Sequence, residues 1–334
     1  MTLAIIDATI GDAGPPFTVR RSSRYAMPIA NSPLLVHVLE DVAGAGAGRA
    51  RIVTGAAHRL DLERLLTGST HGLELSDGEV PAGGESMALL SELADALASE
   101  PVLFHPGDGL FGGQIAAMCE RFMGGDVAAV ISADAARGDG ADASKWRVSD
   151  QPLLLGPQLH SVVVDVLAHA SDGADLVEAL RDSGHPLAEC AVRGAWRYDE
   201  STEGLLAANR LILDALEPTS ENEELGEGNE LRGRVRVAPG TEISNCVVHG
   251  PVAIADSAVL EDSFVGPYTA LGPDTILSGA EIDNAMVLAG AEIRQPGSRI
   301  SASIVGERAQ IRRSFELPRG LQVALPARSS IKLS

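Results

Sequence analysis

The first half of the chain alternates short apolar runs with longer segments of helical periodicity. The apolar runs at Leu3–Ile6, Ala50–Thr54, Pro101–Phe104 and Val127–Ser132 have the length and residue types of buried strands. Helices are expected at Pro33–Ala43, Leu60–Leu66, Glu85–Ala98 and Gly113–Phe122, and residues 203–216 are expected to form a closing helix. Strands that alternate with helices predict an α/β fold, in which a mostly parallel sheet is covered on both faces.

The second half has a different period, because its aliphatic residues recur at steps of five or six. Four stretches that begin at Ile243, Leu260, Ile282 and Ile300 align with one another, and each has a valine at its sixth position. The position of Val237 returns at residues 254, 271, 288 and 305, which is a period of 17. Three steps per coil are typical of the hexapeptide repeats of a left-handed parallel β-helix, in which stacked coils bury one continuous core.

An acidic segment separates the two halves. Residues 217–230 read EPTSENEELGEGNE and show no apolar periodicity, as expected for a linker. The sequence therefore predicts an α/β domain over residues 1–216, a linker over 217–230 and a β-helix over 231–334.

Charge and composition narrow the classes of partner. The 334 residues carry a formal net charge of −20, which disfavours nucleic acid and anionic membrane as partners. No apolar run approaches the roughly 18 residues of a membrane span, and no signal peptide is recognisable. The three cysteines lie far apart and have no metal-binding spacing, so we expect a cytoplasmic protein with reduced thiols.

Two loops are the expected location of a ligand site. Ligands of parallel α/β sheets bind at the carboxyl ends of the strands, which here means the loops after Ile6 and after Phe104. The first loop leads to Arg20 and Arg24, and the second contains Asp108.

Several stretches resemble one known family. They are PIANSPLLVHVLEDV (28–42), VTGAAHRLDLERLLTGSTHGLEL (53–75), HPGDGLFGG (105–113), LLAANRLILD (205–214) and GPYTALG (266–272). Together with the order of the two halves, they resemble the sugar-1-phosphate nucleotidyltransferases, in particular the long-form glucose-1-phosphate thymidylyltransferases. The resemblance implies a Rossmann-like catalytic domain that transfers a nucleotidyl group from a nucleoside triphosphate to a sugar phosphate, releases pyrophosphate and requires Mg²⁺.

The phosphate-binding loop of that family has the form GGxGTRL, and this chain departs from it. The equivalent positions include Thr9, Ile10, Gly11, Asp12 and Gly14. Ile10 places a β-branched side chain where the backbone must approach phosphate, and Asp12 adds a like charge that costs about 1 kcal/mol at 4 Å even in water. We therefore expect this loop to lack the family's usual grip on a triphosphate.

The family's two lysines are also replaced or missing. Arg24 stands near the position of the first lysine, and Arg20 is a second candidate for that charge. Arginine keeps the charge but not the compact ammonium geometry. The only lysines, Lys145 and Lys332, leave no counterpart for the lysine of the later EKP-type motif. The candidate catalytic residues are thus Arg20, Arg24 and Asp108.

Asp108 matches the family's Mg²⁺-binding aspartate, and a second carboxylate is expected from a W-x-D-T-G stretch. The gap-free counterpart, Trp196–Glu200, puts Tyr198 at that aspartate, whereas a shift of one residue brings in Asp199. Asp108 and Asp199 are therefore the candidate Mg²⁺ ligands. Met87 lies near the family's base-recognition position, but we expect it to be a core residue.

Three functional hypotheses follow. One is an active nucleotidyltransferase with a divergent site and Mg²⁺. Another is a non-catalytic homologue that binds a nucleotide or sugar phosphate, or that assembles as a homo-oligomer or with an active paralogue. A third is an acyltransferase built on His249, the only histidine of the repeat region. The lost glycines and lysines remove positive charge from a reaction that depends on electrostatic stabilisation, which favours the non-catalytic homologue.

Overall fold

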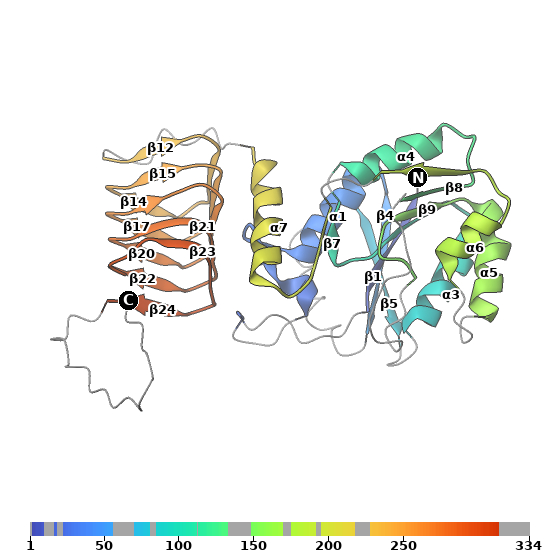
Figure 1. Cartoon of the computed structure of the whole chain (residues 1–334), viewed down its shortest axis with the longest axis horizontal. Coiled ribbons are helices and arrows are strands. Elements are labelled where there is room, and N and C mark those ends of the chain that lie inside the picture. Colours follow the sequence, from blue (N-terminus) through green and yellow to red (C-terminus); the bar gives the residue numbers. More distant parts are fainter. Residues whose placement is uncertain are drawn as a thin grey trace, which may run out of the picture.

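The computed structural model describes residues 2–9, 17–18, 23–55, 70–80, 85–111, 113–132, 148–169, 175–191, 195–217 and 228–313. An α/β domain and a β-helix occupy opposite ends of the molecule, and one helix, α7 (Thr202–Asp214), stands between them (Figure 1). This architecture confirms the predicted α/β sheet followed by a left-handed parallel β-helix.

The α/β domain is built on a seven-stranded sheet with the order β10-β8-β9-β6-β1-β4-β5. Its pairs are parallel except at β9, which runs antiparallel to β6 and β8. The strands are β1 (Leu3–Ala8), β4 (Arg49–Gly55), β5 (Glu74–Val80), β6 (Val102–His105), β8 (Ala129–Ser132), β9 (Leu153–Leu155) and β10 (Leu187–Cys190).

Helices cover both faces of this sheet because successive side chains of a buried strand point to opposite sides. In β1, Ala4 and Ile6 pack with α1 (Leu34–Gly44) and α4 (Gln114–Met123). Ile5 points to the other face, which is covered by α3 (Glu85–Leu97), α5 (His160–Ala168) and α6 (Leu176–Asp182). Burial of each such side chain stabilises the domain by about 1.5–3 kcal/mol for the larger aliphatic residues.

The predicted elements that fall on described residues are confirmed, with ends displaced by a few residues at most. The predicted strands correspond to β1, β4, β6 and β8, and the predicted helices to α1, α3, α4 and α7. The helix expected at Leu60–Leu66 lies outside the described residues. Among the described elements of the domain, the sheet strands β5, β9 and β10, the short strands β2, β3, β7 and β11, and the helices α5 and α6 were not predicted.

The order of the strands reverses at the carboxyl ends of β1 and β6, where open α/β sheets have their ligand crevice. From β1 the chain proceeds to β4 and β5 on one side, then crosses to β6 on the other side of β1. This reversal is the point at which open α/β sheets bind ligands. Three short elements surround the crevice: the 3₁₀-turn η1 (Arg24–Ala26), β7 (Gly109–Leu110) and β11 (Trp196–Arg197), which pairs with β7. The hairpin of β2 (Pro28–Ile29) and β3 (Ser32–Pro33) follows η1.

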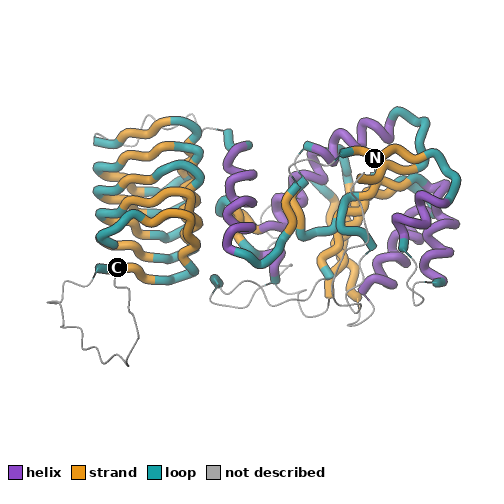
Figure 2. The backbone as a smooth tube through the Cα atoms, in the orientation of Figure 1, coloured by secondary structure: helices purple, strands orange, loops and turns teal. Residues whose placement is uncertain are grey.

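The β-helix stacks short parallel strands in flat coils (Figure 2). Val237, Ile254 and Leu271 lie in register, as do Val248 and Val265, and most of these side chains belong to one continuous core. The strands are β12 (Glu230–Arg232), β13 (Val235–Val237), β14 (Glu242–Ser244), β15 (Val247–His249), β16 (Val252–Ile254), β17 (Val259–Glu261), β18 (Phe264–Val265), β19 (Thr269–Leu271), β20 (Ile276–Ser278), β21 (Glu281–Val287), β22 (Glu292–Arg294), β23 (Ile300–Val305) and β24 (Gln310–Arg312).

The predicted 17-residue period is wrong at one position. Leu271 pairs with Val287 rather than Leu288, and Val287 in turn pairs with Val305. The corner around Asn284 is one residue shorter than the preceding corner, so β21 continues around it as a single strand. Val287 therefore lies in the β-helix core, whereas Leu288 joins a cluster shared with the α/β domain.

Helix α7 fills the space between the two parts of the molecule. Ser201 caps it by accepting a hydrogen bond from the Gly204 N–H, at 2.8 Å. The helix contacts β2 on one side and β21 and β23 on the other. Its fully buried Asn209 accepts from the Ala30 N–H at 3.1 Å and donates to the Tyr268 carbonyl at 3.0 Å. One amide thus joins the hairpin, the helix and the β-helix.

Substitution of Asn209 by alanine should therefore weaken the whole molecule. The change leaves the Ala30 N–H and the Tyr268 carbonyl without this partner, which should lower the free energy of unfolding by about 2–4 kcal/mol. Asn245→Ala is the control, because Asn245 makes its hydrogen bond to Asp262 at an exposed corner. Urea unfolding that gives equal losses for the two variants would contradict this role of Asn209.

Candidate active site

The crevice begins with a carboxylate at the end of β1. Asp7 is almost fully buried, and its Oδ1 accepts hydrogen bonds from the Thr9 N–H at 3.0 Å and the Thr9 hydroxyl at 2.7 Å. The first backbone N–H of the loop equivalent to the phosphate loop is therefore bonded to a carboxylate of the chain itself. Residues 10–16 lie outside the described residues, so the expected weak grip of the whole loop on a triphosphate stays a prediction.

The loop after β6 comes very close to β1. Gly107 has a φ of +49°, and a side-chain carbon there would overlap the Asp7 carbonyl oxygen, so only glycine fits this position. The Gly107 N–H donates to Nδ1 of the fully buried His105 at 3.0 Å. Burial lowers the pKa of His105 to about 3, and the nearby Asp108 offsets this only in part. His105 is accordingly a neutral ring that holds the turn before Asp108.

Two arginines neutralise Asp108, whose side chain is completely buried. Nη1 of Arg24 lies 3.1 Å from Oδ2 of Asp108, and Nη2 of Arg197 lies 3.6 Å from Oδ1. Arg24 itself is 5% exposed, so its charge is also removed from water. Such a pair is retained only because each charge compensates the other.

Further contacts fix the two guanidinium groups. The ring of Tyr198 lies 4.8 Å from the Arg24 guanidinium carbon, a cation–π contact, and the Tyr198 N–H donates to the Asp108 carbonyl at 3.0 Å. Arg197 also contacts Asp150 at 3.4 Å, and Arg24 approaches the exposed Glu200 at 3.8 Å. Asp108 therefore lies inside a network that alternates positive and negative groups.

The predicted Mg²⁺ ligands do not fit a cation site. Asp108 is held by Arg24 and Arg197, whereas Asp199 lies at the start of α7, where Oδ1 accepts from the Ser201 N–H at 3.0 Å and the Ser201 hydroxyl at 2.8 Å. Tyr198, the gap-free counterpart of the second carboxylate, covers Arg24 instead. Within the part of the chain that the structure describes, no three His, Cys, Asp or Glu side chains gather as metal ligands.

Most of the remaining candidate site residues belong to the loop after β1. Arg20, Ile10, Gly11, Asp12 and Gly14 lie outside the described residues, so their roles stay predictions. Arg24 and Asp108, separated by 84 positions, are brought into direct contact.

The expectation that Met87 is a core residue is wrong. Met87 is 51% exposed in the first turn of α3, because the buried stripe of this helix is formed by Leu89, Leu90 and Leu93.

Sequence reasoning missed Arg197, Asp150 and His105. Arg197 stands between two aromatic residues in a short strand, and this alternation could have placed it on the opposite side from Trp196 and Tyr198. Asp150 and His105 carry no comparable signal, since their roles depend on contacts between distant segments.

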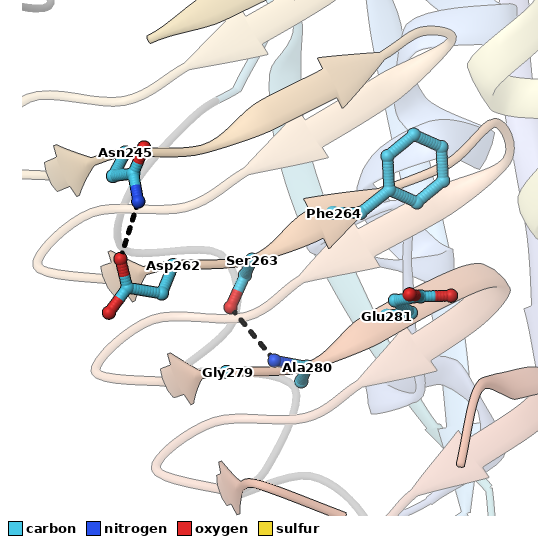
Figure 3. A pocket seen from close by; sticks show the side chains of 7 residues that line it. All are labelled: Asn245, Asp262, Ser263, Phe264, Gly279, Ala280 and Glu281. Carbon is cyan, nitrogen blue, oxygen red and sulfur yellow. Dashed lines mark hydrogen bonds between the residues drawn. The ribbon is translucent and has the colours of Figure 1, made fainter. Parts of the chain in front are cut away.

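A hollow lies on a corner of the β-helix, away from Asp108. It measures about 320 Å³. Asn245, Asp262 and Gly279 occupy the same corner position in successive coils and line the hollow, and Gly279 contributes no side chain to it. Asn245 and Asp262 project on one side of the corner, and Phe264 and Glu281 on the other (Figure 3). His249 packs edge-on against Phe264 at 5.4 Å and lies 3.8 Å from Glu230. His249 thus contacts side chains of neighbouring coils on the surface of the β-helix, and these contacts lend no support to the acyltransferase hypothesis.

Comparisons with known proteins show which proteins this chain is similar to. No protein-family model matches the chain. Glucose-1-phosphate thymidylyltransferases from Streptomyces griseus and Streptomyces antibioticus are 25% and 22% identical to it, over 94% and 93% of this chain and 94% of each relative. The low-salt glycan biosynthesis nucleotidyltransferase Agl11 of Haloferax volcanii is 27% identical, over 93% of this chain and 94% of that protein.

A solved structure gives the same result for the fold. It is described as a glucose-1-phosphate thymidylyltransferase from Bacillus anthracis in complex with sucrose, and it is 17% identical to this chain. The match has a TM-score of 0.51 and covers 63% of this chain and 95% of that one. With the relatives above, it shows that the chain is similar to sugar-1-phosphate nucleotidyltransferases along nearly its whole length and shares their fold.

Among the described residues, no helix is both long enough and apolar enough to cross a membrane.

The buried His105 predicts a specific pH dependence of stability. Its pKa is about 3 in the folded chain and about 6.5 when unfolded, so between these values only the unfolded chain takes up the proton. Stability from this residue is complete above pH 6.5 and falls as the pH drops, by about 2 kcal/mol between pH 7 and pH 5. His105→Asn should lose less stability over this interval than the wild type, and equal losses in the two proteins would contradict this role of His105.

The pairing of Arg24 with Asp108 predicts a response to Mg²⁺ that the wild type lacks. Arg24→Gln leaves a buried carboxylate with weaker compensation, so the free energy of unfolding should fall by about 3–5 kcal/mol. Millimolar Mg²⁺ should then raise the melting temperature of this variant, because a hard cation can take the place of the guanidinium.

The double variant Arg24→Gln, Asp108→Asn is the control for this effect, since it has no carboxylate to bind the ion. Equal Mg²⁺ responses of the wild type and the single variant would refute the interpretation that Arg24 blocks Asp108.

Proposed function

We propose that this chain is a non-catalytic or strongly impaired sugar-1-phosphate nucleotidyltransferase homologue that acts as a sugar-nucleotide-binding subunit or as a regulatory or structural subunit. The observation that carries the proposal is the closed network in which Arg24 and Arg197 neutralise the buried Asp108. The proposed partners are a nucleotide or sugar phosphate in the crevice, and further copies of the chain or an active paralogue.

The physical argument concerns the reaction itself. Nucleotidyl transfer depends on positioned positive charge and a bound cation around the phosphates. In this chain the aspartate that would hold the cation is bonded to arginine, and the other candidate carboxylate, Asp199, is bonded within the first turn of α7. Withdrawal of Arg24 would leave the buried Asp108 charge poorly compensated, at a cost of about 3–5 kcal/mol.

One observation favours an alternative, an active enzyme with a divergent site. The guanidinium groups of Arg24 and Arg197 lie at the crevice between β1 and β6, where a polyphosphate would bind. In an active enzyme these cations would turn from Asp108 to the phosphates, and Mg²⁺ would take their place on the carboxylate. This alternative converts a nucleoside triphosphate and a sugar 1-phosphate to an NDP-sugar and pyrophosphate.

A pyrophosphate-release assay decides between the two functions. The purified chain is incubated with sugar 1-phosphates, each NTP and dNTP, and Mg²⁺, and we expect no release above a blank without protein. Asp108→Asn serves as the matched control, because it removes the carboxylate that any residual activity would need. Turnover that disappears in Asp108→Asn would establish the alternative.

Thermal unfolding with NDP-sugars separates a binding subunit from one that only assembles. A ligand at 100 times its dissociation constant stabilises the folded state by about 2.7 kcal/mol, which raises the melting temperature by several degrees. The shift should be smaller in Arg197→Gln than in the wild type if the ligand lies beside this network. Absence of a shift with every NDP-sugar would restrict the proposal to a regulatory subunit that acts through assembly.

A further inference from the structure

The three charged groups of the network are carried by three separate segments, and each segment has a neighbour in one hydrophobic cluster. Met27 lies three positions after Arg24, Leu110 lies two after Asp108, and Trp196 and Tyr198 flank Arg197. All four belong to a single buried cluster with Met286 and Leu288 of the β-helix. The three segments that carry the charged groups thus pack in one hydrophobic cluster, which also includes residues of the β-helix.

Leu288 reaches this cluster because of the short corner in its coil. With a regular 17-residue step it would occupy the stacked position inside the β-helix, which Val287 fills instead. The Leu288 N–H still donates to the Val305 carbonyl at 2.9 Å, so the backbone is held in the coil while the side chain joins the cluster of the other domain. The irregular step of the repeat therefore occurs at the residue, Leu288, that joins the hydrophobic cluster beside the network.

A backbone hydrogen bond provides a second connection. The Glu307 N–H in the next coil donates to the Phe17 carbonyl at 2.7 Å, and a side-chain carbon at Gly306 would come within 3.0 Å of that oxygen. The Phe17 side chain packs against the same cluster as Leu288, as does Ile304. The coil from Met286 to Glu307 thus contacts the α/β domain through side chains and through its backbone.

We propose that this coil positions the Arg24–Asp108–Arg197 network, so that the state of the site is controlled from the β-helix. Leu288 is the principal positioning residue, because its side chain is committed to the shared cluster and leaves the β-helix core. A partner that displaced this coil would loosen Arg24 and Arg197 together and uncover Asp108. This proposal deepens the regulatory role proposed above. The control of the network by the coil does not depend on that role, but its biological significance does.

Hydrogen exchange of single amides tests this connection without any substrate. The Tyr198 N–H, bonded to the Asp108 carbonyl, and the Met27 N–H, bonded to the Arg24 carbonyl at 3.1 Å, report the opening of the network. Leu288→Ala should speed exchange at both amides by about tenfold, because their segments lose part of their packing. Leu277→Ala is the matched control, since Leu277 is equally apolar and buried but lies in the β-helix core.

Equal acceleration at Tyr198 and Met27 in the two leucine variants would overturn the proposal, since it would reflect general destabilisation. So would unchanged exchange in Leu288→Ala. Because the measurement requires no turnover, its result is independent of the pyrophosphate assay, and either conclusion can fail alone.

A proline variant covers the case in which Leu288→Ala does not fold. Glu307→Pro removes the N–H that bonds Phe17 together with the carboxylate, and the same corner of another coil already carries Pro273. Asp256→Pro is the control. It replaces an acidic residue by proline at the equivalent corner of an earlier coil, where residue 256 is exposed. We expect exchange of the Met27 amide to rise about fivefold in Glu307→Pro relative to Asp256→Pro, and equal rates would contradict the proposal.

Discussion

The contact between Arg24 and the fully buried Asp108 is the interaction on which the rest of the site depends. A carboxylate with no access to water must be compensated, and the chain supplies two guanidinium groups from segments that are far apart in sequence. To deliver them, η1 must return to the sheet after β1, and β11 must pair with β7. The tight approach of Gly107 to Asp7 then sets the depth at which the carboxylate lies.

The fold that this chain shares with nucleotidyltransferases and the chemistry of its site depend on different physical interactions. The sheet, its helices and the β-helix are stabilised by burial of apolar side chains in the expected pattern. The site depends on a few charges and on the backbone that carries them. A lysine replaced by Arg24, and an aspartate position occupied by Tyr198 or Asp199, would change those charges without disturbing the buried pattern.

The sequence predicted the fold to the extent that periodicity reports burial. The strands β1, β4, β6 and β8 were recognisable because they are continuous apolar runs, whereas β5 reads ELSDGEV and lacks such a run. The repeat indicated the β-helix, but it could not show that a corner is one residue short, because Val287 and Leu288 are equally suitable core residues. Only the strand register distinguishes them.

The site was predictable in part for a similar reason. Arg24 and Asp108 stood at motif positions of a known family, so they could be named before their contact was visible. Arg197, Asp150 and His105 matter through tertiary contacts that no local pattern encodes. The structure also assigns Asp199 to the start of α7, a local role that the motif alignment could not separate from metal binding.

The depth of the Arg24–Asp108 pair has a consequence for its response to ionic strength. Mobile ions screen charges through water, so an exposed pair such as Arg121–Asp126 weakens as salt is added. Arg24 and Asp108 are almost inaccessible to those ions, and their attraction is consequently little affected by salt. For a chain with a net charge of −20, whose long-range field does vary with salt, the site keeps the same electrostatic state in dilute and concentrated solutions.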